Sequence, residues 1–149
     1  MPIIRNYQTA DFEQVIHIFD SNIPHFFAVA EKPLFVDFIK ENDSPYFVIE
    51  ENRQIIAAGG YAYDHREGRE IVVFSWGMVE QSQHKKGFGK MLTLYRLQQI
   101  AKDARGLPLI LETSQHTAVF YQKMGFEIIT ITKNGLSLGL DSVKMEKLF

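Results

Sequence analysis

One basic segment with two glycines carries the clearest chemical signal in the sequence. An apolar run is followed by His84-Lys85-Lys86-Gly87-Phe88-Gly89-Lys90 and then by a helical pattern. A helix N-terminus presents unpaired backbone N–H groups and a partial positive charge. Glycine lets an anion approach that backbone closely. The segment therefore predicts a site for a phosphate or pyrophosphate.

Two common phosphate motifs do not fit this segment. A Walker loop requires glycine where His84 stands and Ser or Thr where Met91 stands. A dinucleotide-binding fingerprint requires a third glycine where Leu92 stands. The segment is therefore neither a Walker loop nor a dinucleotide fingerprint.

Composition narrows the class of protein further. The chain has 149 residues, a length expected of one domain spanning 1–149. The formal net charge is −2, which argues against a nucleic-acid partner. The absence of cysteine excludes disulfides, zinc–thiolate sites and cysteine nucleophiles. We expect no metal.

The N-terminal segment and the apolar runs bear on location. Residues 1–7 show no basic segment followed by an apolar run, so we expect no signal peptide. No stretch approaches the ~18 apolar residues of a membrane span. We therefore expect a cytoplasmic protein without a membrane partner.

Hydrophobic patterns predict the order β-α-α-β-β-β-α-β-α-β-β, an α/β fold with one mixed sheet. The run 70–79 is almost continuously apolar, which is typical of a strand buried on both faces. We expect turns at 51–53 and at Asn134-Gly135, and a left-handed helix end at Gly125. The expected strands are 3–7, 46–50, 54–63, 70–79, 107–113, 126–132 and 140–148, and the helices begin at Thr9 or Asp11, Pro33, Gly87 and His116.

Two motifs, in this order, resemble the GCN5-related N-acetyltransferase (GNAT) family. Residues 84–89 are similar to its Arg/Gln-x-x-Gly-x-Gly/Ala loop, between the fourth strand and third helix. Phe120-Tyr121-Gln122-Lys123-Met124-Gly125-Phe126 resembles its Leu/Phe-Tyr-x-x-x-Gly-Phe signature. The resemblance implies a mixed, largely antiparallel sheet of six to seven strands flanked by four helices.

The resemblance also implies a reaction, the transfer of an acetyl group from acetyl-CoA directly to a primary amine of a small molecule or peptide. No covalent enzyme intermediate is needed. The pantetheine arm would pair with Met78 and Val79, and Tyr121 would protonate the leaving thiolate. The pyrophosphate would lie against the backbone of Gly87, Phe88 and Gly89, with His84, Lys85, Lys86 and Lys90 around it.

The chain departs from the family pattern at several positions. His84 replaces Arg or Gln, Lys85 replaces a frequent glycine, and Ser114 stands where an Asn often contacts the cofactor. Residues 71–75 lack the strand glutamate that serves some relatives as general base. Glu112, in an apolar strand, needs a partner or a wet cleft and is a candidate base or a structural hydrogen-bonding group.

Other residues near the expected site keep two interpretations each. His116 is either a cofactor contact or a capping or solvent-facing histidine, and Trp76 is either core or part of the acceptor pocket. The aromatic segment 25–27 either borders the acceptor site or fills the core. Carboxylates that could attract an amine in this region are Glu31, Asp37 and Glu41.

An alternative function from another class is a non-catalytic acyl-CoA-binding regulatory module on the same fold. A further alternative, an aminoacyl-tRNA-acetylating toxin, is disfavoured by the net charge of −2. The family resemblance admits a homodimer. The acceptor and the length of the acyl group stay open at this point.

Overall fold

The structure is a computed structural model that describes residues 1–149. The strands are β1 (Ile3–Asn6), β2 (Tyr46–Glu51), β3 (Gln54–Arg66), β4 (Arg69–Val79), β5 (Leu109–Thr113), β6 (Glu127–Ser137) and β7 (Leu140–Lys147). The helices are α1 (Phe12–Ser21), α2 (Lys32–Glu41), α3 (Phe88–Asp103) and α4 (Ala118–Lys123). Short 3-10 turns occupy Thr9–Asp11, Val29–Glu31 and Gln81–Gln83. The predicted order of strands and helices is confirmed.

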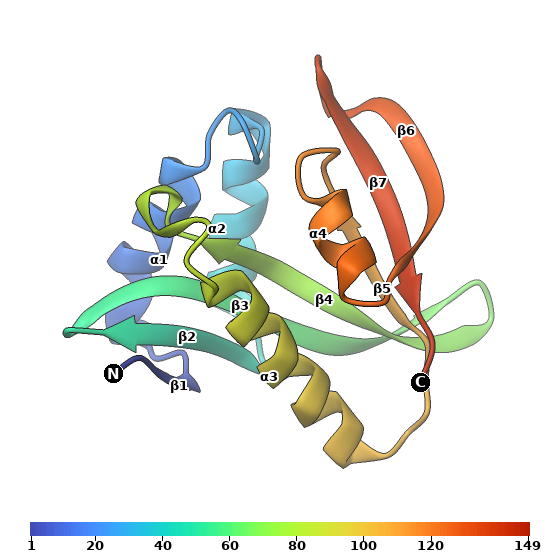
Figure 1. The fold of residues 1–149 in the computed structure, drawn as a ribbon, viewed down its shortest axis with the longest axis horizontal. Helices are drawn as coiled ribbons and strands as arrows, with labels where there is room; N and C mark the ends of the chain where they lie inside the picture. The colour runs from blue at the N-terminus through green and yellow to red at the C-terminus, as the bar shows by residue number, and fades with distance from the viewer.

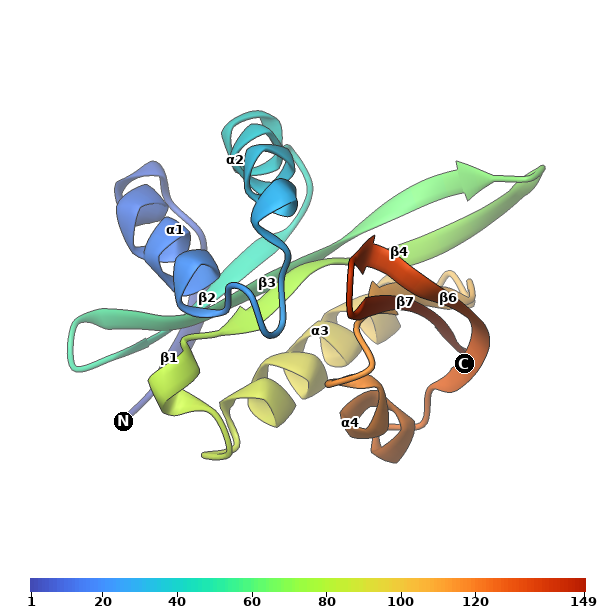
Figure 2. The same cartoon turned by 90° about the horizontal axis from the view of Figure 1, so that it is seen from above.

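All seven strands form one sheet in the order β1-β2-β3-β4-β5-β7-β6. Every neighbouring pair is antiparallel except β4 and β5, which run parallel. Figure 2 shows α1 and α2 on one face of the sheet and α3 and α4 on the other. The predicted fold class, a mixed and largely antiparallel sheet with four helices, is confirmed.

The two faces of the sheet carry separate apolar cores. One forms under α1 and α2, where the aromatic rings of Phe19 and Phe35 stack at 5.3 Å. The other forms under α3 and α4 and includes Leu92, Leu109 and Met145. Each helix pair thus buries one face of the sheet, and the central strands lie between the two cores.

The two central strands β4 and β5 are paired over a very short length. Their register contains only Val72 opposite Leu109 and Val73 opposite Ile110. Beyond that point the strands diverge, as Figure 1 shows. The prediction that 70–79 is buried on both faces is therefore wrong for its second half, where Trp76, Gly77 and Val79 are only half-buried. An apolar run indicates that a strand is central in the sheet, but it does not indicate over what length the neighbouring strand pairs with it.

The predicted turn at Asn134-Gly135 is also wrong. Strand β6 continues through these residues, and the chain reverses instead between Ser137 and Leu140. The side chain of Asn134 accepts a hydrogen bond from the N–H of Gly139 at 2.7 Å, and its own N–H donates to Asp141 at 2.9 Å. Asn134 has the left-handed φ of +55° that is typical of a turn residue. It lies where the register of β6 against β7 shifts, between Thr132 and Ser137, and not at the end of the hairpin.

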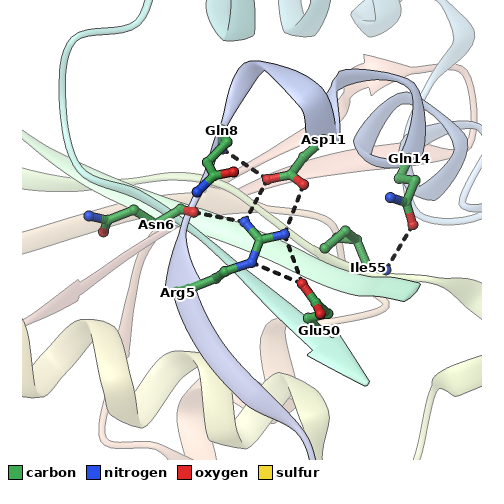
Figure 3. Close-up of polar contacts among 7 residues, drawn as sticks. All are labelled: Arg5, Asn6, Gln8, Asp11, Gln14, Glu50 and Ile55. Atoms are coloured by element: carbon green, nitrogen blue, oxygen red, sulfur yellow. Dashed lines mark hydrogen bonds and ion pairs between the residues drawn. The ribbon is translucent and has the colours of Figure 1, made fainter. Parts of the chain in front are cut away.

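An ion-pair cluster ties the N-terminal strand to the first helix, as Figure 3 shows. Arg5 donates to both carboxylate oxygens of Asp11, at 2.8 and 2.9 Å, and to Glu50 on β2 at 2.9 Å. Asp11 also accepts the N–H of Gln8 at 2.9 Å, at the start of the helical segment. The hydrogen bond from Arg5 is the main cause that lowers the pKa of Asp11.

We predict an acid-dependent loss of stability through Asp11. Because its pKa is lowered in the folded state, the stabilisation is complete above its unfolded pKa of about 3.9 and disappears as the pH falls through the folded value. Asp11→Asn should reduce the unfolding free energy at neutral pH and flatten its decline below about pH 4. Urea unfolding at a series of pH values measures this.

Asp20→Asn is the matched control, since Asp20 forms an exposed ion pair with Lys32 at 2.9 Å. Exposed pairs contribute little, so this variant should stay within about 1 kcal/mol of the wild type. Equal losses of unfolding free energy in the two variants would show that the Arg5–Asp11 ion pair stabilises the fold no more than an exposed ion pair does.

Candidate active site

The divergence of β4 and β5 opens a cleft of about 1020 Å³. Its walls come from elements far apart in the sequence, namely the segment between α1 and α2, the start of α3, the end of β5 and helix α4. The predicted site residues that line it are Met78, Val79, His84, Lys85, Gly87, Gly89, Lys90, Glu112, Ser114, His116 and Tyr121. Lys86 and Phe88 do not line it.

A bulge in β4 marks the position where the cleft opens. Ala58 on β3 pairs with Met78 and Gly60 pairs with Ser75, so two residues of β4, Trp76 and Gly77, face one residue of β3. Trp76 has a φ of +42°, which is rare for a bulky residue. The hydroxyl of buried Tyr46 donates to the Trp76 carbonyl at 3.0 Å and holds this conformation. Bulges re-aim side chains and end regular pairing beside active sites.

The bulge places the Trp76 ring at the border between the core and the cleft. The ring lies 5.3 Å from that of Phe35 and also lines the cleft. Phe26 and Phe27 line the cleft as well, and Phe27 stacks on Phe19 at 4.8 Å. Phe27 and Trp76 therefore pack against one core and also line the cleft, whereas Phe26 lines the cleft only. That these rings border the acceptor stays a prediction.

The start of α3 lies at the cleft with its glycines open to it. Gly87 precedes the helix with a left-handed φ of +90°, and no atom lies within 4 Å of where a Cβ would be. A Cβ on Gly89 would meet the ring of Phe120 at an ordinary 3.6 Å. Lys85 and Lys90 line the cleft beside them, whereas Lys86 donates to Gln83 at 3.3 Å. The start of α3 thus offers backbone, space and positive charge together.

His84 has a structural partner as well as a place in the cleft. Its Nε2 lies 2.8 Å from the carbonyl oxygen of Val79, so Nε2 carries the proton in that contact. The buried Asn22 donates to the same oxygen at 2.9 Å. The last carbonyl of β4 is therefore held from two sides. The sequence offered no signal for Asn22, because a lone asparagine near a helix end is usually a cap.

The carboxylates of the cleft face it from opposite walls. Glu112 is exposed at the end of β5, which meets the expectation that a carboxylate there needs a wet cleft. Glu31 lines the cleft beside α2, accepting the N–H of Ala28 at 2.8 Å. Burial raises the pKa of Glu31, and the charge of Glu112 raises it further. Asp37 and Glu41 do not line the cleft.

Tyr121 enters the cleft from α4. It is half-buried, with its ring edge-on to those of Phe120 at 5.0 Å and Phe126 at 5.5 Å. The packing of these rings fixes the direction of the phenol. The backbone N–H of Phe126 donates to the carbonyl of Tyr121 at 3.0 Å, which closes the helix at left-handed Gly125 as predicted.

Ser114 and His116 shape the turn between β5 and α4. Ser114 is buried, and its hydroxyl accepts the N–H of His116 at 3.3 Å while its carbonyl accepts that of Ala118. The imidazole of His116 stacks on that of His25 at 4.0 Å, which joins the two sides of the cleft mouth. Burial lowers the pKa of His116, and so does the neighbouring His25.

Arg96 is a candidate that the sequence pattern did not reveal. It lines the cleft from α3 and is buried between Leu92 and Ile100, one turn away on each side. The spacing could have revealed it. Arg96 stands four residues from both Leu92 and Ile100, so a charged side chain falls on the apolar face of the helix, where apolar residues are expected.

Comparison with known proteins identifies the class to which this fold and cleft belong. A family model described as an acetyltransferase (GNAT) domain matches residues 42–128. The chain therefore belongs to the GNAT family. No curated protein sequence matches it significantly.

Several solved structures share the fold over nearly the whole chain. A ribosomal-protein-alanine N-acetyltransferase from Brucella melitensis is 19% identical, with a TM-score of 0.77 and 99% of each chain covered. An N-acetyltransferase from Staphylococcus aureus Mu50 is 21% identical, with a TM-score of 0.77 and 99% and 98% covered. An aminoglycoside 6′-N-acetyltransferase in complex with coenzyme A is 15% identical, with a TM-score of 0.74 and 98% and 96% covered. At these identities the likeness shows the fold.

No helix of the structure is both long enough and apolar enough to cross a membrane.

We predict that the two glycines at the start of α3 differ in their tolerance of a side chain. Gly87→Ala should lower the unfolding free energy by about 1–2 kcal/mol, because an L-residue is strained at φ +90°. Gly89→Ala should be neutral or raise it by up to about 1 kcal/mol, since alanine favours a helix interior. Urea unfolding measures both, and equal destabilisation would contradict the assigned conformations.

Proposed function

We propose that this protein transfers an acetyl group from acetyl-CoA directly to a primary amine of a small molecule or peptide. The observation that carries the proposal is the cleft between β4 and β5, which has an open helix N-terminus at one end and a phenol and two carboxylates along its walls. We take residues 1–149 as one catalytic domain, supported by the 99% coverage of the Brucella melitensis enzyme.

The start of α3 suits the phosphate end of acetyl-CoA. Helix N–H groups and the helix dipole favour an anion there. Gly87 and Gly89 leave the backbone accessible, and Lys85 and Lys90 supply charge. The open edge of β4 beyond Val73 suits the amide groups of the pantetheine arm, which would lie along Met78 and Val79. A coenzyme A complex of a structural relative agrees with this use of the fold.

Acetyl-CoA supplies its acetyl group as a thioester, with a C–S bond that breaks as the amine nitrogen forms a bond to the carbonyl carbon. Tyr121 donates its phenolic proton to the sulfur, which receives the electron pair of the broken bond. A thiol with a pKa near ~8.5 and a phenol near ~10 make this transfer uphill by about 2 kcal/mol. Proton donation during bond cleavage reduces that cost.

The amine must lose a proton before or during its attack. An alkyl ammonium with a pKa of ~10.4 costs about 4.6 kcal/mol to deprotonate at pH 7. Glu112 is our proposed acceptor of that proton, because its carboxylate is exposed in the cleft at the end of β5. Glu31 on the opposite wall attracts the ammonium form, and the rings of Phe26 and Phe27 contact its alkyl part.

We predict that Lys90 contributes to acetyl-CoA binding. Lys90→Glu replaces a cation at the phosphate end by an anion and should weaken binding by roughly tenfold or more, because charge-assisted hydrogen bonds are worth ~1.5–3 kcal/mol. Native mass spectrometry should detect one acetyl-CoA per wild-type chain, and calorimetric titration gives the Kd.

Lys102→Glu is the matched control, an exposed lysine in the last turn of the same helix. It changes the net charge equally and should leave the Kd within about twofold, since charges beyond a Debye length are screened. If both variants weaken acetyl-CoA binding equally, the effect comes from the net charge of the protein and not from the position of Lys90. Absence of acetyl-CoA binding to the wild type would overturn the proposed function.

We predict that Tyr121 and Glu112 are needed for turnover. Tyr121→Phe and Glu112→Gln should each lower kcat by ~10²-fold or more with little change in acetyl-CoA affinity, because general acid–base groups contribute ~10²–10⁴. Release of free thiol from acetyl-CoA measures transfer. The acceptor panel contains alkyl amines, aminoglycosides and peptides with an N-terminal alanine, following the structural relatives.

Tyr63→Phe and Glu127→Gln are matched controls outside the cleft and should leave kcat unchanged. Tight acetyl-CoA binding with no transfer to any amine of the panel would reject the catalytic proposal and favour a non-catalytic acyl-CoA-binding module. Full activity of Tyr121→Phe would reject its role as the acid.

A further inference from the structure

The buried cation on α3 has no assigned role in the mechanism above. Arg96 is 1% exposed and lines the floor of the cleft. The ion pairs of the structure all involve other residues, so its charge meets no carboxylate. Burial lowers its pKa, but an arginine stays protonated in proteins. Burying such a charge without an anionic partner is unfavourable for folding.

The surrounding backbone is shaped around this side chain. The guanidinium carbon lies 3.7 Å from the centre of the Phe74 ring, and Nη1 donates to the carbonyl of Gly60 at 3.2 Å. A Cβ on Gly77, in the bulge, would lie only 2.8 Å from Nη2, and one on Gly59 would lie 3.2 Å from Cζ. The guanidinium therefore occupies space that only glycines at both positions leave free.

The hydrogen-bonding capacity of Arg96 is incompletely used. Its Nε is buried and donates to no partner. The groups that favour its charged form are two phenols, first that of Tyr121 and then that of Tyr46. Tyr46 already donates to the Trp76 carbonyl under the helices α1 and α2. Tyr121 is thus the neighbour in the cleft whose oxygen can gain negative charge.

We propose that Arg96 is a positioning residue that stabilises the negative charge formed when the thioester C–S bond breaks. The electron pair of that bond goes to the coenzyme A sulfur, and the proton of Tyr121 follows it, which leaves the charge on the Tyr121 oxygen. The guanidinium compensates the anion at both stages, because Arg96 and Tyr121 line the same cleft where β4 and β5 separate. This inference rests on the proposed function, which places the thioester there.

Coenzyme A and desulfo-coenzyme A test the inference without any acceptor. The two ligands differ only in the sulfur atom, so titration of lysines at the phosphate end cancels in the ratio of their Kd values. A thiol titrates near pH ~8.5 and is mostly thiolate at about pH 9.5. We expect the bound thiol of the wild type to have a pKa about one unit below that of the free thiol. The Kd of desulfo-coenzyme A divided by that of coenzyme A should then rise roughly tenfold between about pH 6.5 and 9.5.

Variants at Arg96 should change this pH dependence in a graded way. Arg96→Gln and Arg96→Met should make the ratio independent of pH, and Arg96→Lys should keep at least half of the rise on a logarithmic scale. Arg105→Gln is the matched control, because Arg105 also stacks on an aromatic ring, that of Tyr63 at 4.1 Å, but lies outside the cleft. It should leave the ratio as in the wild type.

The outcomes separate the two proposals. Binding of both ligands with a ratio that does not rise in the wild type, or that rises equally in Arg96→Gln, overturns the role of Arg96 and leaves the proposed function standing. Failure of both ligands to bind overturns the proposed function and the inference with it.

Thermal unfolding provides a second readout that distinguishes function from structure. Replacing a buried charge by an apolar side chain of similar volume is often neutral or stabilising. Arg96→Met should therefore keep or raise the Tm while removing the pH dependence of the ratio. A fall in Tm of more than about 5 °C would assign Arg96 a structural role and overturn the inference.

Discussion

The bulge at Trp76 and Gly77 is the constraint on which the site depends. It ends the regular pairing of β3 with β4 and coincides with the divergence of β4 from β5. The strained backbone of Trp76 is held from one face of the sheet by the hydroxyl of Tyr46, while Arg96 packs against Gly77 from the other. Strain of this kind persists only where surrounding contacts fix it. A cleft through the middle of a sheet is possible because both faces are anchored by their own core.

The cleft carries positive and negative side chains in separate places, although the net charge of the whole chain is only −2. Lys85 and Lys90 lie at the start of α3, and Glu31 and Glu112 line the walls near the aromatic residues of the α1–α2 segment. One end therefore favours an anionic ligand and the other a cationic one. In a partly enclosed cleft such interactions are stronger than at an open surface. In the proposed function, the phosphates of acetyl-CoA lie at the first end and an ammonium acceptor at the second.

Much of the fold follows from local patterns, and the errors have local causes too. The order of elements was predictable because hydrophobic periodicity differs between helices and strands. Asn134 has the left-handed backbone of a turn residue, but its partners Gly139 and Asp141 place the reversal further along the chain. The apolar run 70–79 marked a central strand, yet periodicity along one strand carries no information on how far its neighbour follows it.

The sequence by itself determined the glycine-containing start of α3, where we predict the anion site, because Gly87, Gly89 and the free N–H groups of the helix are contiguous in the chain and depend on local backbone geometry. Only the tertiary structure decided what faces that site. Asn22 and Glu31 come from the segment between α1 and α2, Arg96 from α3 and Glu112 from β5, and all four line the cleft where β4 and β5 separate. Arg96 shows the reason most clearly. Its helical position predicts burial, but whether a buried charge meets a carboxylate, a phenol or nothing depends on contacts across the sheet that no local pattern encodes.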